Sequence, residues 1–191
     1  MNHKFNGMVA VLGLLVLLAQ PVWGDERLVL PGLVPPVVMT LSPVGRLPAT
    51  NHLELAIGLP LRNQAALTLK LRQMYDASST NFHRYLTPKE FAANYGPTEV
   101  DYQKVLEFAR NNGLSIVRTY DNRQLVDVSA TVAAIDNAFQ INLFRYQHPT
   151  EHRLFYAPNA EPSIPAGVPI LSVEGLNNYE RPHPALQQQF H

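Results

Sequence analysis

Residues 98–147 read TEVDYQKVLEFARNNGLSIVRTYDNRQLVDVSATVAAIDNAFQINLFRYQ, and the spacing of their apolar positions changes from helical to extended and back. The first part is typical of a helix, because Thr98 is a favoured N-cap residue, Asp101 places an acid in the first turn, and Gly113 follows the last helical position. One face of this predicted helix is apolar, made by Tyr102, Val105, Leu106 and Ala109.

The rest of this stretch predicts a hairpin, a helix and a strand. Residues 114–119 and 124–130 are two short strand-like runs, and the turn residues Asp121 and Asn122 lie between them, which indicates a β-hairpin. Thr131 then caps a second helix, whose apolar face holds Val132, Ile135 and Phe139, and residues 141–147 return as a strand.

Upstream, residues 52–58 (HLELAIG) alternate apolar and polar side chains as a half-buried strand does. Asn63 is expected to cap a helix with an apolar face of Leu67, Leu71, Met74 and Tyr75. Together the elements follow the order β-α-β-β-α-β, which predicts an α+β fold of the ferredoxin-like type, with helices on one face of an antiparallel sheet. We expect this domain to span residues 51–184, with further strands at 153–157 and 170–173 and a short tail at 185–191.

The N-terminal region is typical of a secreted protein. Lys4 precedes the uninterrupted apolar run of residues 8–19, and Val22 and Gly24 are small enough to flank a signal-peptidase site, so residues 1–24 are predicted to be a signal peptide. An uncleaved N-terminal anchor is the alternative. Residues 25–50 are rich in proline, with five prolines and two glycines in residues 26–50, and are predicted to form an extended leader that lies on the domain or trails from it.

Composition narrows the possible functions. The chain has no cysteine, so neither disulfides nor thiol chemistry are expected. It carries 15 basic and 15 acidic residues, and removal of Lys4 with the signal leaves a formal charge of −1 with neutral histidines. This balance argues against a nucleic-acid partner and against binding to an anionic membrane, and after signal cleavage the chain is expected outside the cytoplasm, secreted or periplasmic.

The sequence contains no motif that predicts a catalytic site, and no cofactor is expected. His148 to His152 (HPTEH) matches the H-x-x-E-H zinc pattern, but that chemistry requires a helix, and here the five residues lie between two strand-like runs with Pro149 after the first histidine. They are therefore predicted to form a hairpin tip, with no metal. No serine lies in a G-x-S-x-G context, and no phosphate-binding or dinucleotide-binding loop is present.

Residues 81–97 (NFHRYLTPKEFAANYGP) contain side chains suited to acid-base chemistry, but they are better explained as the start of a helix. Thr87, Pro88 and Glu90 predict a capping box with proline at the first helical position, and Gly96–Pro97 ends the helix before Thr98 opens the next. His83 and Tyr85 have no role in that device. They are predicted either to fill the groove between the two helices or to contact a partner.

This stretch and its continuation to Val117, with FQINLFRYQ and the closing VEGLNNYERPHP, resemble the activation propeptide of the sedolisin (kumamolisin-like) serine-carboxyl peptidases. The resemblance runs from about residue 53 to residue 184. It implies a fold similar to subtilisin-type propeptides, and a domain that assists folding of its peptidase and holds it inactive until acid pH. The family's S-G-T-S serine motif and its Glu/Asp pair are absent from the sequence, so no catalytic residue is transferred and the chain is not expected to be an enzyme.

We therefore expect a propeptide domain that acts in trans, with the catalytic domain of a sedolisin-type peptidase as its partner. A truncated peptidase precursor without a role of its own, and a secreted binding module that reuses the fold, are the alternatives. The expected partner contacts are His83 and Tyr85 beside the capping box and Arg181 and His183 in the tail, although the tail residues could equally be solvated.

Overall fold

The computed structural model describes residues 26–180, which form an α+β fold with four α-helices and antiparallel sheets. The predicted signal peptide at residues 1–24 and the tail at 185–191 lie outside the described residues. Within residues 26–180, no helix combines the length and the hydropathy that crossing a bilayer requires.

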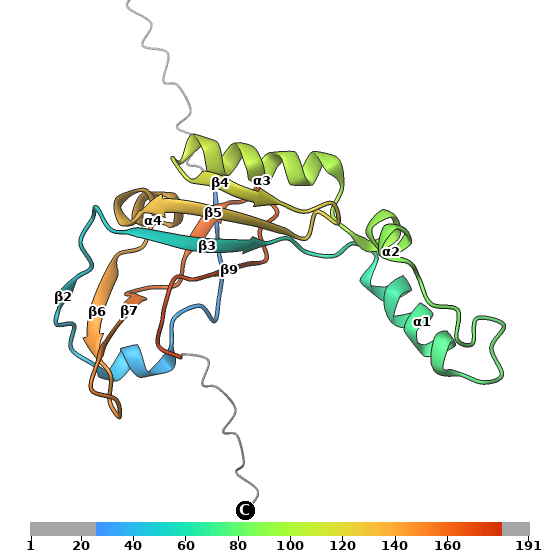
Figure 1. The fold of residues 1–191 in the computed structure, drawn as a ribbon, viewed down its shortest axis with the longest axis horizontal. Helices are drawn as coiled ribbons and strands as arrows, with labels where there is room; N and C mark the ends of the chain where they lie inside the picture. Colours follow the sequence, from blue (N-terminus) through green and yellow to red (C-terminus); the bar gives the residue numbers. More distant parts are fainter. Residues whose placement is uncertain (1–25, 181–191) are drawn as a thin grey trace, which may run out of the picture.

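The main sheet has four strands in the order β4 (Ser115–Thr119), β5 (Leu125–Thr131), β3 (His52–Gly58) and β9 (Ser172–Glu174), and every neighbouring pair is antiparallel. The predicted hairpin is the β4–β5 pair, with a register irregularity between Ile116 and Arg118. The strand predicted at residues 52–58 is the central strand β3, which pairs with β5 along its whole length (Figure 1).

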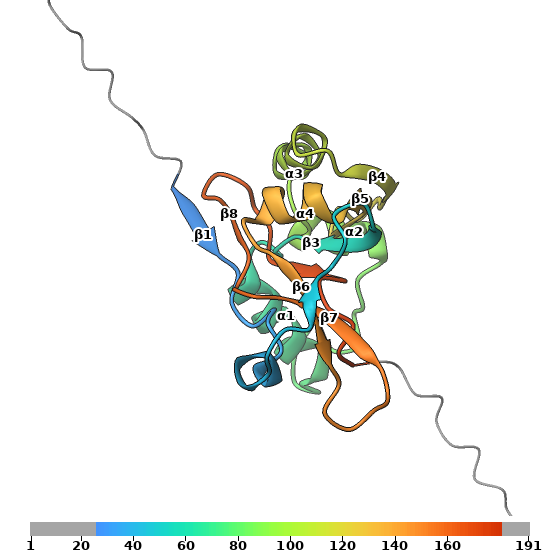
Figure 2. The same ribbon diagram turned by 90° about the vertical axis from the view of Figure 1, so that its left-hand side faces the viewer.

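Two helices lie beside this sheet, α3 (Glu99–Asn111) and α4 (Val132–Phe139), as Figures 1 and 2 show. Both begin where predicted. The Thr98 hydroxyl accepts a hydrogen bond from the Asp101 amide at 3.0 Å, and the Thr131 hydroxyl accepts one from the Ala134 amide at 3.3 Å. Each cap satisfies a backbone donor that the helix itself leaves unpaired.

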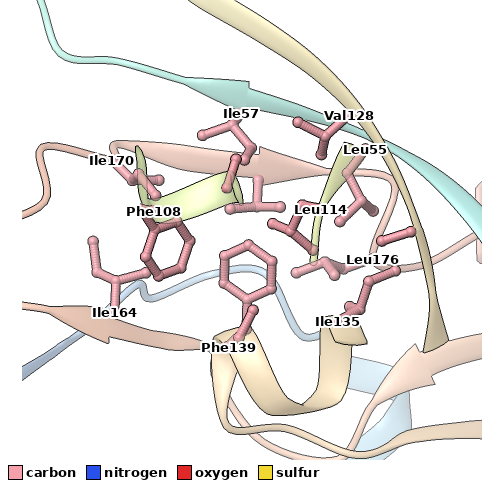
Figure 3. Close-up of a cluster of buried hydrophobic side chains, with 14 of the residues drawn as sticks. Leu55, Ile57, Phe108, Leu114, Val128, Ile135, Phe139, Ile164, Ile170 and Leu176 are labelled. Carbon is pink, nitrogen blue, oxygen red and sulfur yellow. The ribbon is translucent and has the colours of Figure 1, made fainter. Parts of the chain in front are cut away.

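The main core lies between the helices and the sheet. Ile57 of β3 and Val128 of β5 are fully buried on the sheet face that the helices cover, because alternate strand residues point to the same face. Phe108 of α3 and Phe139 of α4 point into the same cluster with ring centroids 5.8 Å apart (Figure 3). The apolar face predicted for α3 is buried as expected.

The prediction that residues 141–147 complete the main sheet is wrong. This strand is β6 (Leu143–Gln147), and it lies in a second sheet between β2 (Gly45–Arg46) and β7 (Leu154–Pro158). The place beside β3 is taken instead by β9, some thirty residues further along the chain. The ferredoxin-like arrangement of the whole domain therefore stays a prediction.

The proline-rich leader lies on the domain, one of the two alternatives left open by its sequence. β1 (Arg27–Val29) pairs with β8 (Ser163–Pro165), and a 3₁₀ helix, η1 (Pro36–Thr40), follows. Three leader side chains are buried, namely Leu30, Val38 and Leu47. The leader thus contributes apolar surface to both hydrophobic clusters of the protein.

The helices α1 (Gln64–Tyr75) and α2 (Pro88–Tyr95) project from the end of the molecule opposite β2, β6 and β7 (Figure 1). The apolar face predicted for α1 does not enter a core. Met74 is buried, but Leu71 and Tyr75 are 45% and 73% exposed. The predicted cap is also wrong in its chemistry. Asn63 does precede the helix, but its side-chain amide donates to the Asn94 carbonyl at 3.0 Å instead of capping α1.

Candidate interaction surfaces

The start of α2 has the capping box that its sequence predicts. The Glu90 amide donates to the Thr87 hydroxyl at 3.2 Å, and the Glu90 carboxylate accepts from the Thr87 amide at 2.8 Å. Pro88 occupies the first helical position, where the missing N–H costs no hydrogen bond. Thr87 and Glu90 therefore satisfy backbone groups, Pro88 starts the helix, and all three have structural roles.

Asp76, in the connection between α1 and α2, and Glu90, in the first turn of α2, are both held by such local bonds. The pKa of Glu90 lies below its ordinary value because of the Thr87 amide and then the Thr87 hydroxyl. The pKa of Asp76 is lowered by the Ser78 hydroxyl at 2.7 Å and the Ser78 amide at 2.9 Å. Hydrogen bonds to a carboxylate favour its charged form, so both groups stabilise this connection in the ionised state.

His83 and Tyr85 are exposed on the same connection and do not fill the groove between the two helices. His83 has a left-handed backbone, with φ of 56°, and its amide donates to the Met74 carbonyl at 3.1 Å. Its ring stacks on Phe82 with centroids 3.7 Å apart, and the Tyr85 ring follows at 6.1 Å and nearly parallel. The structure thus presents a short row of aromatic rings to solvent.

The predicted tail residues Arg181 and His183 lie outside the described residues, but the segment that leads to them is firmly attached. The Arg153 guanidinium donates to the Asn178 carbonyl at 2.9 Å and to the Tyr179 carbonyl. The Asn178 side-chain carbonyl accepts from the Tyr156 backbone amide at 2.7 Å, and the Asn178 backbone amide donates to the Tyr156 carbonyl at 3.2 Å. These bonds fix the position and direction of residues 177–180 against β7.

The motif HPTEH belongs to this attachment. It lies at the tip of the β6–β7 hairpin, as predicted. The His148 ring is buried, stacks on Tyr179 with centroids 4.9 Å apart, and accepts at Nδ1 from the Glu151 amide at 3.0 Å. Glu151 in turn pairs with Arg153 at 2.5 Å. Sequence reasoning missed this role, because its partner Tyr179 is thirty-one residues away and nothing local indicates the contact.

The four-stranded sheet has a second face, which α3 and α4 do not cover. Along β3, Glu54 and Ala56 point to this face, since they alternate with the buried Leu55 and Ile57. It holds a shallow depression of about 560 Å³, lined in part by Glu54, Ala56, Val117, Arg118, Asp127 and Glu174. We call these residues the open sheet face.

The open sheet face is acidic at its centre. Ala56 lies directly opposite Asp127 on one neighbouring strand and opposite Glu174 on the other, and Glu54 is the next residue of β3 on the same face. Asp127 accepts a hydrogen bond from the Tyr120 hydroxyl at 2.8 Å. Three carboxylates therefore lie around one small side chain, with Arg118 of β4 on the far side of Asp127, and a broad, shallow surface of this kind suits docking better than chemistry.

The sequence matches one protein family and is similar to three known peptidases. The family model of the pro-kumamolisin activation domain matches residues 41–179. The chain is 29% identical over 148 residues to sedolisin of Pseudomonas sp. (strain 101), covering 76% of this chain and 25% of that protein. It is 30% identical over 142 residues to xanthomonalisin of Xanthomonas sp. (strain T-22), covering 73% and 17%.

A third relative is kumamolisin of Bacillus sp. (strain MN-32), 26% identical over 147 residues, with 74% of this chain and 26% of that protein covered. In all three the similarity is thus confined to about a quarter of the relative or less. The matched part includes the α1–α2 connection, the main sheet and the attached segment at residues 177–179.

Proposed function

The chain belongs to the pro-kumamolisin activation domain family of the serine-type peptidases, and from this we propose that it acts in trans as a folding assistant and acid-released inhibitor of a sedolisin-type peptidase. The observation that carries the proposal is the extent of the match. It covers most of this chain but only 17–26% of each relative, so the similarity includes an activation domain and leaves out most of each peptidase.

We assign the open sheet face as the main docking surface. The opposite face is occupied by α3, α4 and the core, so the open sheet face is the broad surface of the main sheet that a partner can reach. Its central position is small, since Ala56 lies between longer side chains, and helices or loops of a partner can approach the backbone there.

The attached segment supports the second part of the proposal, which concerns the cleft of the peptidase. Arg153 and the Tyr179–His148 stack set where the chain leaves the domain. The residues that follow, including Arg181 and His183, are proposed to lie along the substrate cleft and to block it. An exit point fixed in advance lowers the entropy lost when the tail binds.

Release by acid follows from the charges of the domain. Acidification protonates imidazoles first and carboxylates next, and six histidines lie beyond residue 24. The domain therefore changes from nearly neutral to strongly cationic. This change weakens the electrostatic complementarity that docking at neutral pH uses, and it adds repulsion from a partner that also becomes cationic.

Secretion belongs to the same proposal. A signal peptide at residues 1–24 would bring the chain to the compartment in which a secreted peptidase is active. N-terminal sequencing of the exported protein tests this, and we expect the first residue to be Asp25.

The test of function is inhibition of a sedolisin-type peptidase that lacks its own matching region, measured with the full chain between about pH 3 and pH 7. We expect strong inhibition at neutral pH that disappears in acid. Ala56→Arg places a long cation at the centre of the open sheet face and should abolish inhibition. Val100→Arg adds the same charge at an exposed position of α3 and is the matched control.

Equal inhibition at every pH, or none at neutral pH, contradicts the proposal. Absence of binding to any peptidase of the family would favour a binding module for another partner, or a product without a role of its own.

A further inference from the structure

The second feature of the surface is the projecting unit of residues 62–95, which we call the arm. It consists of α1, the connection 76–87 and α2 (Figure 1). Its neck is held by Arg62, whose amide donates to the Tyr95 carbonyl at 2.7 Å and whose guanidinium donates to the Ala93 carbonyl at 2.9 Å. At the base, Arg123 donates to the Pro97 carbonyl at 2.8 Å. The arm is therefore fixed at its root, while its far end extends away from the core.

The arm carries the exposed aromatic surface of the protein. Among residues 26–180, every exposed tyrosine or phenylalanine lies in it, namely Tyr75, Phe82 and Tyr85. Leu71 adds to this surface, because residues four apart on a helix share a face and Leu71 precedes Tyr75 by one turn. Aromatic side chains are enriched at protein interfaces and often dominate their binding energy.

The arm is also cationic, in contrast to the rest of the described chain. It holds five basic residues and two acids, a formal charge of +3, whereas the other described residues hold eight basic residues and twelve acids, a charge of −4. Both arm acids are engaged in local hydrogen bonds, as described above for Asp76 and Glu90. Within residues 26–180, Arg72, Arg84 and Lys89 make no ion pair.

A second copy of the chain is the competing occupant. A two-fold dimer with one arm against the other would bring two surfaces of charge +3 together, whereas a closed dimer in which each arm contacts the body of the other copy would not. The relatives indicate a better occupant, since about three quarters or more of each lies outside the region that matches this chain.

Building on the proposed function, we propose that the arm is a second docking surface, which binds an apolar, acidic surface on the catalytic domain of the partner peptidase. The aromatic rings and Leu71 supply apolar contact area, and Arg72, Arg84 and Lys89 supply the charge that selects an acidic surface. The open sheet face and the arm belong to one chain and are joined by the neck at Arg62, so they bind with the avidity of two linked sites.

The experiment measures the dissociation constant between the full chain and a sedolisin-type peptidase that lacks its own matching region, at neutral pH. One variant, Leu71→Ser/Tyr75→Ser/Tyr85→Ser, removes apolar surface from the arm. A second, Arg72→Gln/Arg84→Gln/Lys89→Gln, removes its free charges. The matched control, Met39→Ser/Val44→Ser/Val100→Ser, removes comparably exposed apolar side chains from the rest of the protein. Thermal unfolding verifies that each variant is folded.

We expect the apolar variant to weaken binding by about tenfold or more, because truncated aromatic anchors commonly lose that much or more. The control should stay within about twofold of the unmodified chain, as substitutions outside an interface do. The charge variant should bind more weakly at low salt and should lose most of the salt dependence that the unmodified chain shows.

The assignment of the arm is overturned if both arm variants bind as tightly as the unmodified chain, or if the control weakens binding equally. The proposed function still holds in that case, provided that the unmodified chain inhibits the peptidase. If the unmodified chain does not bind the peptidase, both proposals fail. Sedimentation of the chain alone tests whether a second copy occupies the arm. A dimer that the apolar variant abolishes would show that it does, and would refute the inference.

Discussion

Replacement of Arg153 by methionine should release the end of the domain without unfolding it. The Arg153 side chain is 13% exposed, donates to the carbonyls of Asn178 and Tyr179, and pairs with Glu151 at 2.5 Å. Methionine keeps most of the aliphatic volume and removes all of these polar contacts. A hydrogen bond to a charged group contributes about 1.5–3 kcal/mol when buried, so two such bonds to residues 178 and 179 give about 3–6 kcal/mol.

Loss of these bonds should mainly detach residues 177–180 from β7 and leave the rest of the domain folded, because the freed carbonyls can be solvated once the segment leaves β7. The assay is amide hydrogen exchange. The Asn178 amide, which donates to the Tyr156 carbonyl, should lose protection by two orders of magnitude or more, as about 3 kcal/mol implies. Amides of β3 and β5 should change far less.

Arg153→Lys is the matched control, because lysine keeps the charge but lacks the planar fork that reaches two carbonyls at once. It should give an intermediate loss of protection. Unchanged exchange at Asn178 in the methionine variant would refute the reasoning, and so would an equal loss across β3 and β5, which would mean that Arg153 supports the whole core. If the attached segment aims the tail, the methionine variant should also inhibit the peptidase less strongly.

Three further predictions concern stability. Thr98→Ala removes the cap of α3 and should lower the free energy of unfolding by about 1 kcal/mol, measured by urea denaturation. Phe139→Ala leaves a cavity where a fully buried ring meets Phe108 and should destabilise the protein by about 3–5 kcal/mol in the same assay. The pKa values of Asp76 and Glu90 are lowered in the folded protein, so the stabilisation from their hydrogen bonds is present above the ordinary carboxyl pKa and is lost as pH falls through the folded-state values. Hydrogen exchange at residues 76–90, corrected for its intrinsic pH dependence, should therefore increase in acid. The increase should be smaller in an Asp76→Asn/Glu90→Gln variant.

Local patterns predicted the elements whose contacts are mostly local. The N-caps at Thr98 and Thr131, the β4–β5 hairpin and the buried face of α3 follow from short-range chemistry, and the structure has each of them. The capping box at Thr87 is of the same kind, because every atom involved lies within four residues.

The incorrect predictions concern elements whose contacts are distant in the sequence. Periodicity shows that a strand or helix has an apolar face, but it does not show what covers that face. β6 therefore could not be assigned to its own sheet, and β9 could not be placed beside β3, from which more than a hundred residues separate it. The apolar residues of α1 were expected in a core for the same reason, and Leu71 and Tyr75 are exposed.

The contact role of His83 and Tyr85 stays a prediction. Elimination singles them out in the sequence, and the structure shows both exposed on the arm. The open sheet face was not identified, because Glu54, Asp127 and Glu174 belong to three strands and meet only when the sheet forms.

The most direct test of the central claim is the mass of the complex at two pH values. The full chain and a sedolisin-type peptidase without its own matching region are mixed in equal amounts and separated by size exclusion with mass detection. A one-to-one complex at neutral pH that separates into active peptidase and free chain in acid is the predicted result. Two separate proteins at neutral pH, or a complex that persists in acid with the peptidase still inactive, would contradict it.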